Sequence, residues 1–219
     1  MTIWAIVPLK PLRDGKSRLA HILSADERAQ LTTEILKRTL RVLEDTAAIY
    51  RSLVISRDPA VLKIARAEGA FTFGEGEKLG LNAALTRASH VAAAQGASSI
   101  LILPADLPFL STGDVATILS SAGTHGGGVN GNSSGYLPSR IAHISPDRQN
   151  DGTNALYISP PLGFKFHYGP QSFQRHLEEA EHLGISCRVV HTPGVKFDID
   201  SEEDWRTYMA MQGQESPAV

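Results

Sequence analysis

The sequence has little cysteine, no apolar run of membrane-spanning length and no excess of charge of one sign. Its single cysteine, Cys187, can form neither an internal disulfide nor a zinc site by itself, which fits a reducing compartment. The N-terminal residues lack the basic segment and the apolar core of a signal peptide. No apolar run approaches the roughly 20 residues that cross a bilayer. We therefore expect a cytoplasmic protein with no membrane partner.

The charge of the chain is nearly balanced. Its 219 residues include 21 Lys and Arg against 23 Asp and Glu, which gives a formal net charge of -2. A protein that binds nucleic acid needs a basic surface for the phosphate backbone, so we expect no nucleic-acid partner. A balanced total still allows one local basic pocket for a small anionic ligand.

Short apolar runs alternate with helical patterns along the chain. Expected strands cover residues 3–9, 52–56, 71–73, 99–103, 141–144, 154–158, 187–191 and 195–199. Expected helices cover residues 16–23, 25–45, 59–68, 82–95, 111–122 and 171–183, and a last helix follows Ser201. This alternation predicts an α/β fold with a mostly parallel sheet covered by helices on both faces. We expect one domain over residues 1–212 and a flexible tail over 213–219.

Three of the expected helices begin with explicit capping signals. Ser24 and Glu27 have the spacing of a capping box, and Ser201 with Asp204 repeats that spacing before the last helix. Asp58 precedes a proline at the first helical position. By contrast, the glycine- and serine-rich segment 123–135 carries no such signal and is predicted to be a mobile loop or an insertion.

The loop after the first strand is rich in positive charge. Ligands of parallel sheets bind beyond the carboxyl ends of the strands. Residues 8–19 leave the first strand there and contain Lys10, Arg13, Lys16 and Arg18. These charges, together with the exposed N–H groups of the following helix, suit a triphosphate. A solvated basic turn is the alternative interpretation.

Two other segments match catalytic motifs only in part. Gly15, Lys16 and Ser17 match the end of a P-loop, but that pattern needs a first glycine where this chain has Lys10. Residues 131–135 fit G-x-S-x-G, but they lack the strand before the serine and the helix after it. We therefore expect neither a P-loop nor a serine hydrolase.

Three aspartates follow predicted strands. Asp106 comes just after the apolar strand 99–103, and Asp198 and Asp200 alternate along the predicted strand 195–199 and its end. Residues at i and i+2 of a strand point to the same side, so this pair could meet a metal held by Asp106. Magnesium prefers a few carboxylates together with phosphate oxygens. The alternative is that Asp106 stabilises a turn and Asp200 begins the last helix.

A further group of small polar residues lies on two tight turns. Thr153 follows an aspartate and a glycine, and Gly169 and Ser172 precede a predicted helix N-terminus that could bind an anion. Helix capping by Ser172 is the alternative. His176, like the neighbouring Lys165 and His167, is predicted to line the pocket rather than to catalyse a reaction.

Taken together, these segments resemble the 2-phospho-L-lactate guanylyltransferase family, which includes phosphoenolpyruvate guanylyltransferases. The resemblance is carried, in order along nearly the whole chain, by VPLKPLRDGKSRLA, LILPADLPFL, SPDRQNDGTNALYISPP, FHYGPQSFQRHLEEA and FDIDSEEDW. The family works in the biosynthesis of coenzyme F420. It is similar in fold to molybdenum-cofactor guanylyltransferases and sugar nucleotidyltransferases, which implies a three-layer αβα, Rossmann-like fold of the nucleotide-diphospho-sugar transferase type.

The resemblance also implies roles for individual residues. Catalysis would involve Lys10, Lys16 and Asp106. GTP would be bound by Pro8, Leu9, Lys10, Lys16, Gly80, Leu81, Asn82 and Pro104. The phosphorylated acid would be bound by Thr153, Gly169 and Ser172, and Mg²⁺ would be held by Asp106, Asp198 and Asp200. The segment 126–135 departs from the family pattern as an insertion and could alter the choice of acceptor.

The expected reaction transfers GMP from GTP to a small phosphorylated carboxylic acid and releases pyrophosphate. The sequence does not distinguish phosphoenolpyruvate, 2-phospho-L-lactate and 3-phosphoglycerate as acceptors, and the preference for guanine follows from the resemblance alone. A nucleotidyltransferase for a molybdopterin or a sugar phosphate and a non-catalytic GTP-binding module remain alternatives. The oligomeric state is open, with a homodimer among the possibilities.

Overall fold

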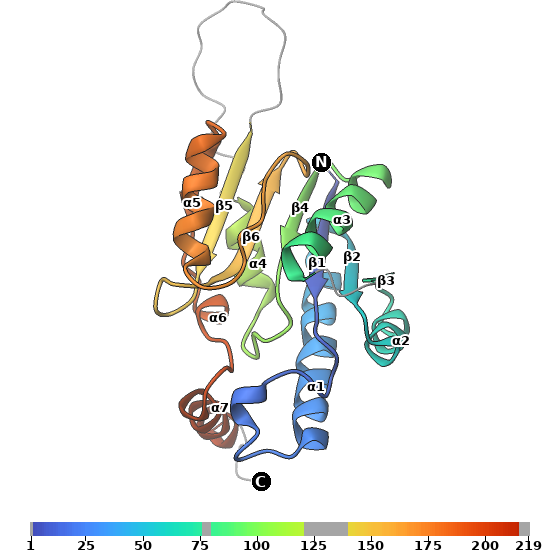
Figure 1. The fold of residues 1–219 in the computed structure, drawn as a ribbon, viewed down its shortest axis with the longest axis vertical. Coiled ribbons are helices and arrows are strands. Elements are labelled where there is room, and N and C mark those ends of the chain that lie inside the picture. The colour runs from blue at the N-terminus through green and yellow to red at the C-terminus, as the bar shows by residue number, and fades with distance from the viewer. Residues whose placement is uncertain (1, 76–79, 121–139, 215–219) are drawn as a thin grey trace, which may run out of the picture.

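A computed structural model of the chain describes residues 2–75, 80–120 and 140–214, and the fold within these ranges is built on one seven-stranded sheet (Figure 1). The strands are β1 (Ile3–Pro8), β2 (Ile49–Ser56), β3 (Phe71–Gly74), β4 (Ser99–Ile102), β5 (Ile141–Pro146), β6 (Thr153–Ser159) and β7 (Ser186–Val189). The helices are η1 (Ser17–Leu19, a 3₁₀ turn), α1 (Ala25–Glu44), α2 (Pro59–Ala67), α3 (Leu81–Ala94), α4 (Thr112–Ser120), α5 (Ser172–His182), α6 (Pro193–Lys196) and α7 (Glu202–Gln214).

The strand order is β3-β2-β1-β4-β6-β5-β7, and most neighbouring strands are parallel. The exception is β6, which runs antiparallel to both β4 and β5. Ile102, at the end of β4, lies opposite Leu156 of β6. Because the two strands run in opposite directions, Thr153 at the start of β6 lies at the same edge of the sheet as the end of β4. Because β6 is antiparallel, its first residue, Thr153, lies at the edge where the parallel strands end.

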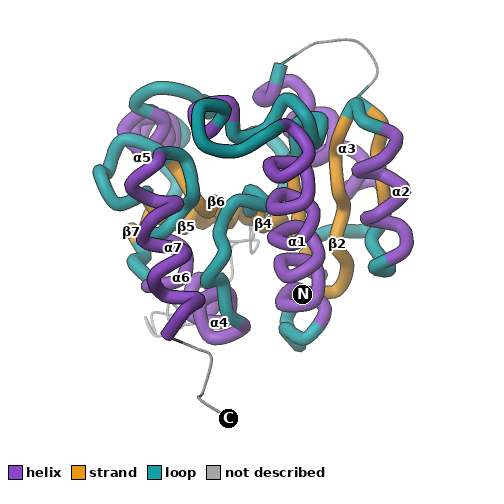
Figure 2. Tube along the Cα trace, turned by 90° about the horizontal axis from the view of Figure 1, so that it is seen from below, coloured by secondary structure: helices purple, strands orange, loops and turns teal. Residues whose placement is uncertain are grey.

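Helices cover both faces of the sheet, which confirms the predicted three-layer αβα fold (Figures 1 and 2). The side chains of β1 alternate between the two faces, as a strand buried on both sides requires. Ile3 and Val7 pack in one apolar cluster with α1, α2 and α4. Trp4 and Ile6 pack in the opposite cluster with α3 and α5. Figure 2 looks from below onto one end of the sheet, where loops lie between the covering helices.

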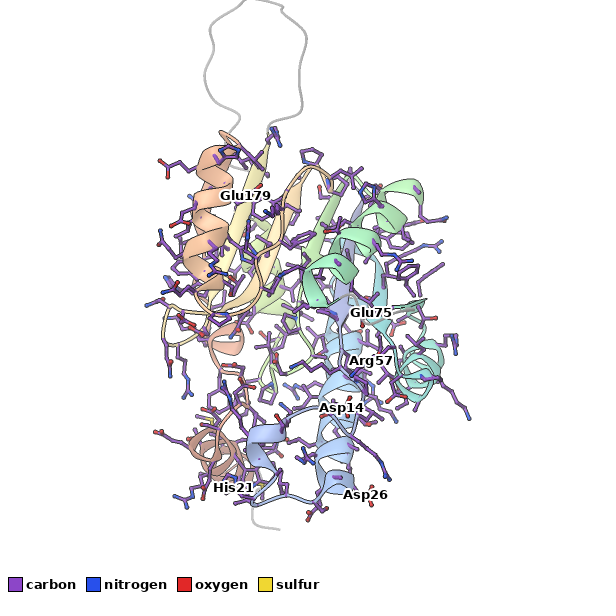
Figure 3. All side chains as sticks on the ribbon, viewed as in Figure 1. Asp14, His21, Asp26, Arg57, Glu75 and Glu179 are labelled. Carbon is purple, nitrogen blue, oxygen red and sulfur yellow. The ribbon has the colours of Figure 1, made fainter. Side chains whose placement is uncertain are left out.

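A third apolar cluster joins the two ends of the chain below the sheet. Leu19 of the first loop and Ile35 of α1 pack against Phe197 and Ile199. His21, labelled beside α7 in Figure 3, adds a polar contact, because its Nε2 lies 2.9 Å from the Glu202 carboxylate. The segment that carries two of the predicted metal ligands is therefore fixed to the loop that carries the predicted lysines.

The predicted helix starts are confirmed. The Glu27 amide donates to Ser24 Oγ at 3.2 Å, and the Ser24 amide donates to the Glu27 carboxylate at 2.7 Å, which completes the capping box. Asp58 accepts a hydrogen bond from the Ala60 amide at 2.8 Å. Asp204 accepts from both the amide and the hydroxyl of Ser201, at 2.7 and 2.8 Å.

The strand predicted over residues 195–199 is wrong. The chain there forms the helical turn α6 and then an extended segment outside the sheet. Its polar backbone groups are bonded elsewhere: Gly194 N–H donates to Asp114 Oδ1 at 3.1 Å, and the Val195 carbonyl accepts from Asn154 Nδ2 at 2.9 Å. With Pro193 pre-setting the first turn, these bonds favour a helical turn over sheet pairing.

One predicted helix is also shorter than expected. The helix expected over residues 16–23 shrinks to η1, because Lys16 adopts a left-handed conformation with φ 50° that an α-helix does not accept. At the other end of the chain, the last helix, α7, ends at Gln214. The segment 123–135, the G-x-S-x-G at 131–135 and the last five residues of the predicted tail lie outside the described ranges. Within those ranges, no helix is both long enough and apolar enough to cross a bilayer.

Candidate functional site

The three predicted aspartates meet at the edge of the sheet where β1 and β4 end. Asp106, Asp198 and Asp200 each offer one carboxylate oxygen, and these atoms lie within 4.8 Å of one another. The Ile199 amide donates to the Asp106 carbonyl at 3.3 Å, which joins the loop after β4 to the C-terminal segment. These three residues are called the acidic triad below. Their convergence does not need the predicted strand, because the backbone hydrogen bond brings the two segments together.

The electrostatics of the acidic triad favour a bound cation. Burial, and then the charge of Asp200, raise the pKa of Asp106, while Lys16 and Lys10 oppose that shift. Burial and the charges of Asp106 and Asp200 raise the pKa of Asp198 to about 6. Within the described residues, the buried Asp106 Oδ1 has no hydrogen-bond partner. Carboxylates that repel one another and an unpaired buried oxygen fit a hard divalent cation that takes oxygen ligands.

Lys10 and Lys16 are both close enough to Asp106 for their positive charges to act on its carboxylate. Lys16 Nζ donates to the Ile199 carbonyl at 2.9 Å, between the two C-terminal aspartates. The positive φ of Lys16 is unusual for a residue with a side chain, and such strained residues concentrate at functional sites. Arg18 adds an exposed ion pair with Asp200 at 3.3 Å. The basic loop and the acidic triad thus form one charged surface.

The other arginine of the basic loop turns away from the triad. Arg13 forms an exposed ion pair with Asp26 at 2.8 Å. Asp14, in the same loop, is paired at 2.8 Å with Arg57, and Figure 3 shows the two side chains side by side. The four positive charges that the sequence places together therefore separate, and only Lys10, Lys16 and Arg18 stay with the carboxylates.

The remaining residues predicted to bind nucleotide lie around the same edge. Pro8 ends β1, and the amide of Leu9 donates to the Ile55 carbonyl at 2.9 Å. Pro104 stands between the end of β4 and Asp106. Gly80 caps α3 with φ 82°, and the next residue, Leu81, is 41% exposed although it is apolar. An exposed leucine beside a helix N-terminus can pack against the flat face of a base.

A second group of residues, at the start of β6, is buried and uncharged. His176 is fully buried, and its Nδ1 lies 2.9 Å from the hydroxyl of Thr153. The backbone amide of His167 donates to His176 Nε2 at 2.9 Å. Since Nε2 accepts, Nδ1 carries the ring proton and donates to Thr153, which leaves the hydroxyl hydrogen of Thr153 available for a ligand. Burial and the neighbouring His167 lower the pKa of His176 to about 3, so the ring stays neutral.

Tyr168 belongs to the same group. Its ring meets that of His176 edge-on, with the centroids 4.9 Å apart. Its backbone is held at both polar atoms by one side chain: Asn82 Oδ1 accepts from the Tyr168 amide at 2.7 Å, and Asn82 Nδ2 donates to the Tyr168 carbonyl at 3.0 Å. Thr153, Tyr168 and His176 are called the neutral cluster below. Asn82 thus joins the segment predicted to contact the base to the neutral cluster.

Gly169 and Ser172 lie directly beside the neutral cluster. Gly169 has φ 129°, a conformation that favours glycine, and its carbonyl accepts from the Ser172 amide at 3.1 Å. Ser172 is buried and is the first residue of α5. Of the other predicted rim residues, Lys165 is exposed and His167 is half-buried. His167 Nε2 is 3.4 Å from Glu179, which Figure 3 labels on α5, and the Lys165 amide also donates to Glu179.

The sequence placed His176 at the rim of the pocket, but the residue is fully buried, and Tyr168 was not predicted as a site residue. The available signal was the segment FHYGPQS, in which Tyr168 directly precedes a glycine already assigned to the site. What the sequence could not reveal is that Tyr168 is tied to a side chain 86 residues earlier. The acidic triad and the neutral cluster together offer charged groups for phosphates and neutral donors for a second, smaller anion.

Comparison with known proteins gives a consistent result. A family model described as "Guanylyl transferase CofC like" matches residues 3–133 and 139–218. A phosphoenolpyruvate guanylyltransferase from Rubrobacter xylanophilus is 43% identical over 204 residues, covering 93% of this chain and 92% of that protein. A protein of the same name from Sphaerobacter thermophilus is 32% identical, covering 93% of this chain and 91% of that protein.

Solved structures share the fold at low sequence identity. A putative nucleotide-diphospho-sugar transferase from Desulfovibrio desulfuricans G20 superposes with a TM-score of 0.74 at 14% identity, covering 99% of this chain and 90% of that chain. A nucleotidyl transferase from Methanothermobacter thermautotroptrophicus gives a TM-score of 0.65 at 14% identity, covering 98% of this chain and 99% of that chain. These likenesses confirm the predicted nucleotidyltransferase type of fold.

Proposed function

This chain belongs to the CofC-like guanylyl transferase family, and on that premise we propose that it transfers GMP from GTP to phosphoenolpyruvate and releases pyrophosphate. The reaction serves the biosynthesis of coenzyme F420. Phosphoenolpyruvate comes first among the candidate acceptors because two relatives that match over most of their length carry its name. The observation that carries the proposal is the placement of two lysines and three clustered carboxylates beside a buried, uncharged group of donors.

The chemistry that this site needs is alignment and charge neutralisation. A phosphate oxygen of the acid attacks the α-phosphorus of GTP, a new P–O bond forms, and the bond to the β-phosphate oxygen breaks. A phosphate monoester has a second pKa of about 6, so the attacking oxygen is already ionised at neutral pH and needs no strong base. Two anions must still be brought together, which is a task for positioned cations and donors.

Asp106, Asp198 and Asp200 are the residues that would hold Mg²⁺. Their oxygen-only ligand set and their mutual repulsion suit this ion. When bound, the ion supplies positive charge to the phosphate oxygens of the nucleotide. Lys10 and Lys16, on the loop after β1, stabilise the triphosphate and the departing pyrophosphate.

The remaining contacts divide between the two substrates. Around the end of β1 and the start of α3, the nucleotide contacts are Pro8, Leu9, Gly80, Leu81, Asn82 and Pro104. The acid is bound by Thr153, Gly169 and Ser172, where the free hydroxyl hydrogen of Thr153 can donate to a carboxylate or a phosphate oxygen. A cytoplasmic location and a single domain over residues 1–212 remain predictions from the sequence.

The test is pyrophosphate release from GTP and Mg²⁺ with phosphoenolpyruvate, 2-phospho-L-lactate and 3-phosphoglycerate offered separately, and with ATP and CTP as nucleotide controls. We expect release from GTP that requires phosphoenolpyruvate. Release only with a sugar phosphate or a molybdopterin would replace the acceptor, and GTP binding without release would indicate a binding module. Orthophosphate released without any acid would identify a hydrolase and contradict the proposal.

A further inference from the structure

The hydroxyl of Tyr168 is buried and has no hydrogen-bond partner within the part of the chain that the structure describes. Buried side-chain polar atoms are nearly always bonded, because leaving one unpaired forfeits the hydrogen bonds that it would make in water. A tyrosine whose only task was to fill the core could be a phenylalanine at lower cost. The unpaired hydroxyl therefore indicates a bond that forms with something other than the described residues.

The surroundings of this side chain show which group the hydroxyl can reach. The Tyr168 ring lies against His176, which is hydrogen-bonded to Thr153. The residue after Tyr168 is Gly169. The phenol oxygen also lies within the electrostatic reach of Asp106, although it makes no hydrogen bond to that carboxylate. Tyr168 thus packs against a residue that bonds Thr153, and its hydroxyl is close enough to Asp106 to sense that charge.

We propose that Tyr168 is a further catalytic residue, whose hydroxyl donates a hydrogen bond to the reacting phosphate of the acid while that phosphate attacks GTP. This inference rests on the proposed function. The tyrosine keeps its proton throughout: the acid's phosphate oxygen forms the new bond to the α-phosphorus, pyrophosphate takes the electron pair of the broken bond, and the hydroxyl only orients the attacking group. Burial and the charge of Asp106 raise the pKa of the phenol, which agrees with a group that only donates.

Asn82 is the positioning residue for this hydroxyl. Both polar atoms of its side chain are used on the backbone of Tyr168, so the direction of the tyrosine depends on a residue at the start of α3. Asn82→Asp keeps the acceptor for the Tyr168 amide and loses the donor to its carbonyl, whereas Asn82→Ala loses both. We expect the two variants to lower turnover in that order, with Asn82→Ala the more affected.

The test compares Tyr168→Phe with Tyr50→Phe, which removes an exposed hydroxyl at the start of β2, at the opposite end of the strands from the site. For Tyr168→Phe we expect kcat/KM for phosphoenolpyruvate to fall about 10- to 100-fold, the range for one hydrogen bond to a charged group, while the KM for GTP stays unchanged. The thermal midpoint should stay equal or rise, because the variant removes an unpaired buried hydroxyl. Tyr50→Phe should match the wild type in activity.

The opposed effects on activity and stability make the outcomes distinct. Unchanged turnover in Tyr168→Phe overturns the inference and leaves the proposed function standing. A lowered thermal midpoint with a proportional loss of active enzyme also overturns it, because the hydroxyl would then be structural. If the wild type itself releases no pyrophosphate with any of the three acids, both the proposed function and this inference fall, whereas active wild type with impaired Tyr168→Phe supports both.

Discussion

The acidic triad and the neutral cluster lie beside each other at one end of the sheet, yet they are built in opposite ways. The triad brings three carboxylates together from two loops, and burial raises the pKa values of Asp106 and Asp198. The neutral cluster instead keeps His176 uncharged and uses it to orient the hydroxyl of Thr153. A site that must hold two anions without trapping them can use a removable cation for one and neutral donors for the other.

The largest expected effect tests the charged side of this comparison. Asp106→Asn removes one negative charge from the triad, and we expect turnover to fall by about a hundredfold or more, as when an active site loses a key charge stabiliser. Measured without metal, the folded state should be no less stable, because a repelled carboxylate is replaced by a neutral group. Near-normal turnover in steady-state assays would remove Asp106 from the mechanism.

The next effect tests the neutral side. Thr153→Val removes a hydroxyl that accepts a hydrogen bond from His176 and can donate one to a ligand. We therefore expect kcat/KM for the acid to fall about 10- to 100-fold. Leaving the buried His176 N–H unpaired should also lower the free energy of unfolding by about 1–3 kcal/mol. Thr153→Ser is the matched control, because it keeps the hydroxyl and should retain most of both properties. Loss in Thr153→Ser with full activity in Thr153→Val would mean that the methyl group matters and the hydroxyl does not.

The neutrality of His176 predicts a pH effect on stability. Its pKa falls from the ordinary value near 6.5 to about 3 on folding, so only the unfolded chain takes up this proton between those values. The contribution of His176 to the free energy of unfolding is therefore complete above pH 6.5 and is lost as the pH falls. At pH 5 the loss is about 2 kcal/mol.

The measurement for this effect is denaturant unfolding of the wild type and His176→Asn at pH 7.5 and pH 5. The wild type should lose more stability than the variant over this interval, by about 2 kcal/mol. The raised pKa values of Asp106 and Asp198 also affect stability, but both residues are present in both proteins and their effect cancels in the difference. Identical pH dependence in the two proteins would contradict a neutral His176 in the folded state.

The smallest expected effect concerns the ion pair that joins the basic loop to the acidic triad. Arg18 pairs with Asp200 at 3.3 Å, and both side chains are largely exposed, so the pair contributes little to stability. Arg18→Gln should shift the free energy of unfolding by less than about 1 kcal/mol. It should lower the Mg²⁺ concentration for half-maximal activity by up to about threefold, because a competing cation is removed. A magnesium titration that moves in the opposite direction would show that Arg18 assists the site.

The contrast between the two groups also explains what the sequence could predict. Asp106 and Lys16 could be found because charged residues after an apolar strand stand out in the pattern, and strand ends in such sheets face ligands. Asp198 and Asp200 were correctly brought to Asp106, but through a strand that does not exist, since Asn154 and Asp114 bond the backbone before them. Periodicity reports which side of an element is buried, and it carries no information on such long-range bonds.

The neutral cluster could be predicted only in part. Thr153 and Gly169 were found through turns and a helix start, but the direction of β6, which places Thr153 at the correct edge, follows from pairing that no local pattern reveals. His176 and Tyr168 look like ordinary core residues in the sequence. Their importance depends on a tautomer fixed by the His167 amide and on a hydroxyl left unpaired by burial.

The most direct measurement of the central claim is ³¹P NMR of the wild-type reaction with GTP, phosphoenolpyruvate and Mg²⁺. We expect the resonance of the acid's phosphate to disappear, while resonances of a new diphosphate linkage and an equal amount of pyrophosphate appear together. Loss of GTP to GDP and orthophosphate with the acid unchanged, or no turnover with GTP bound, would contradict the transfer of GMP to that acid.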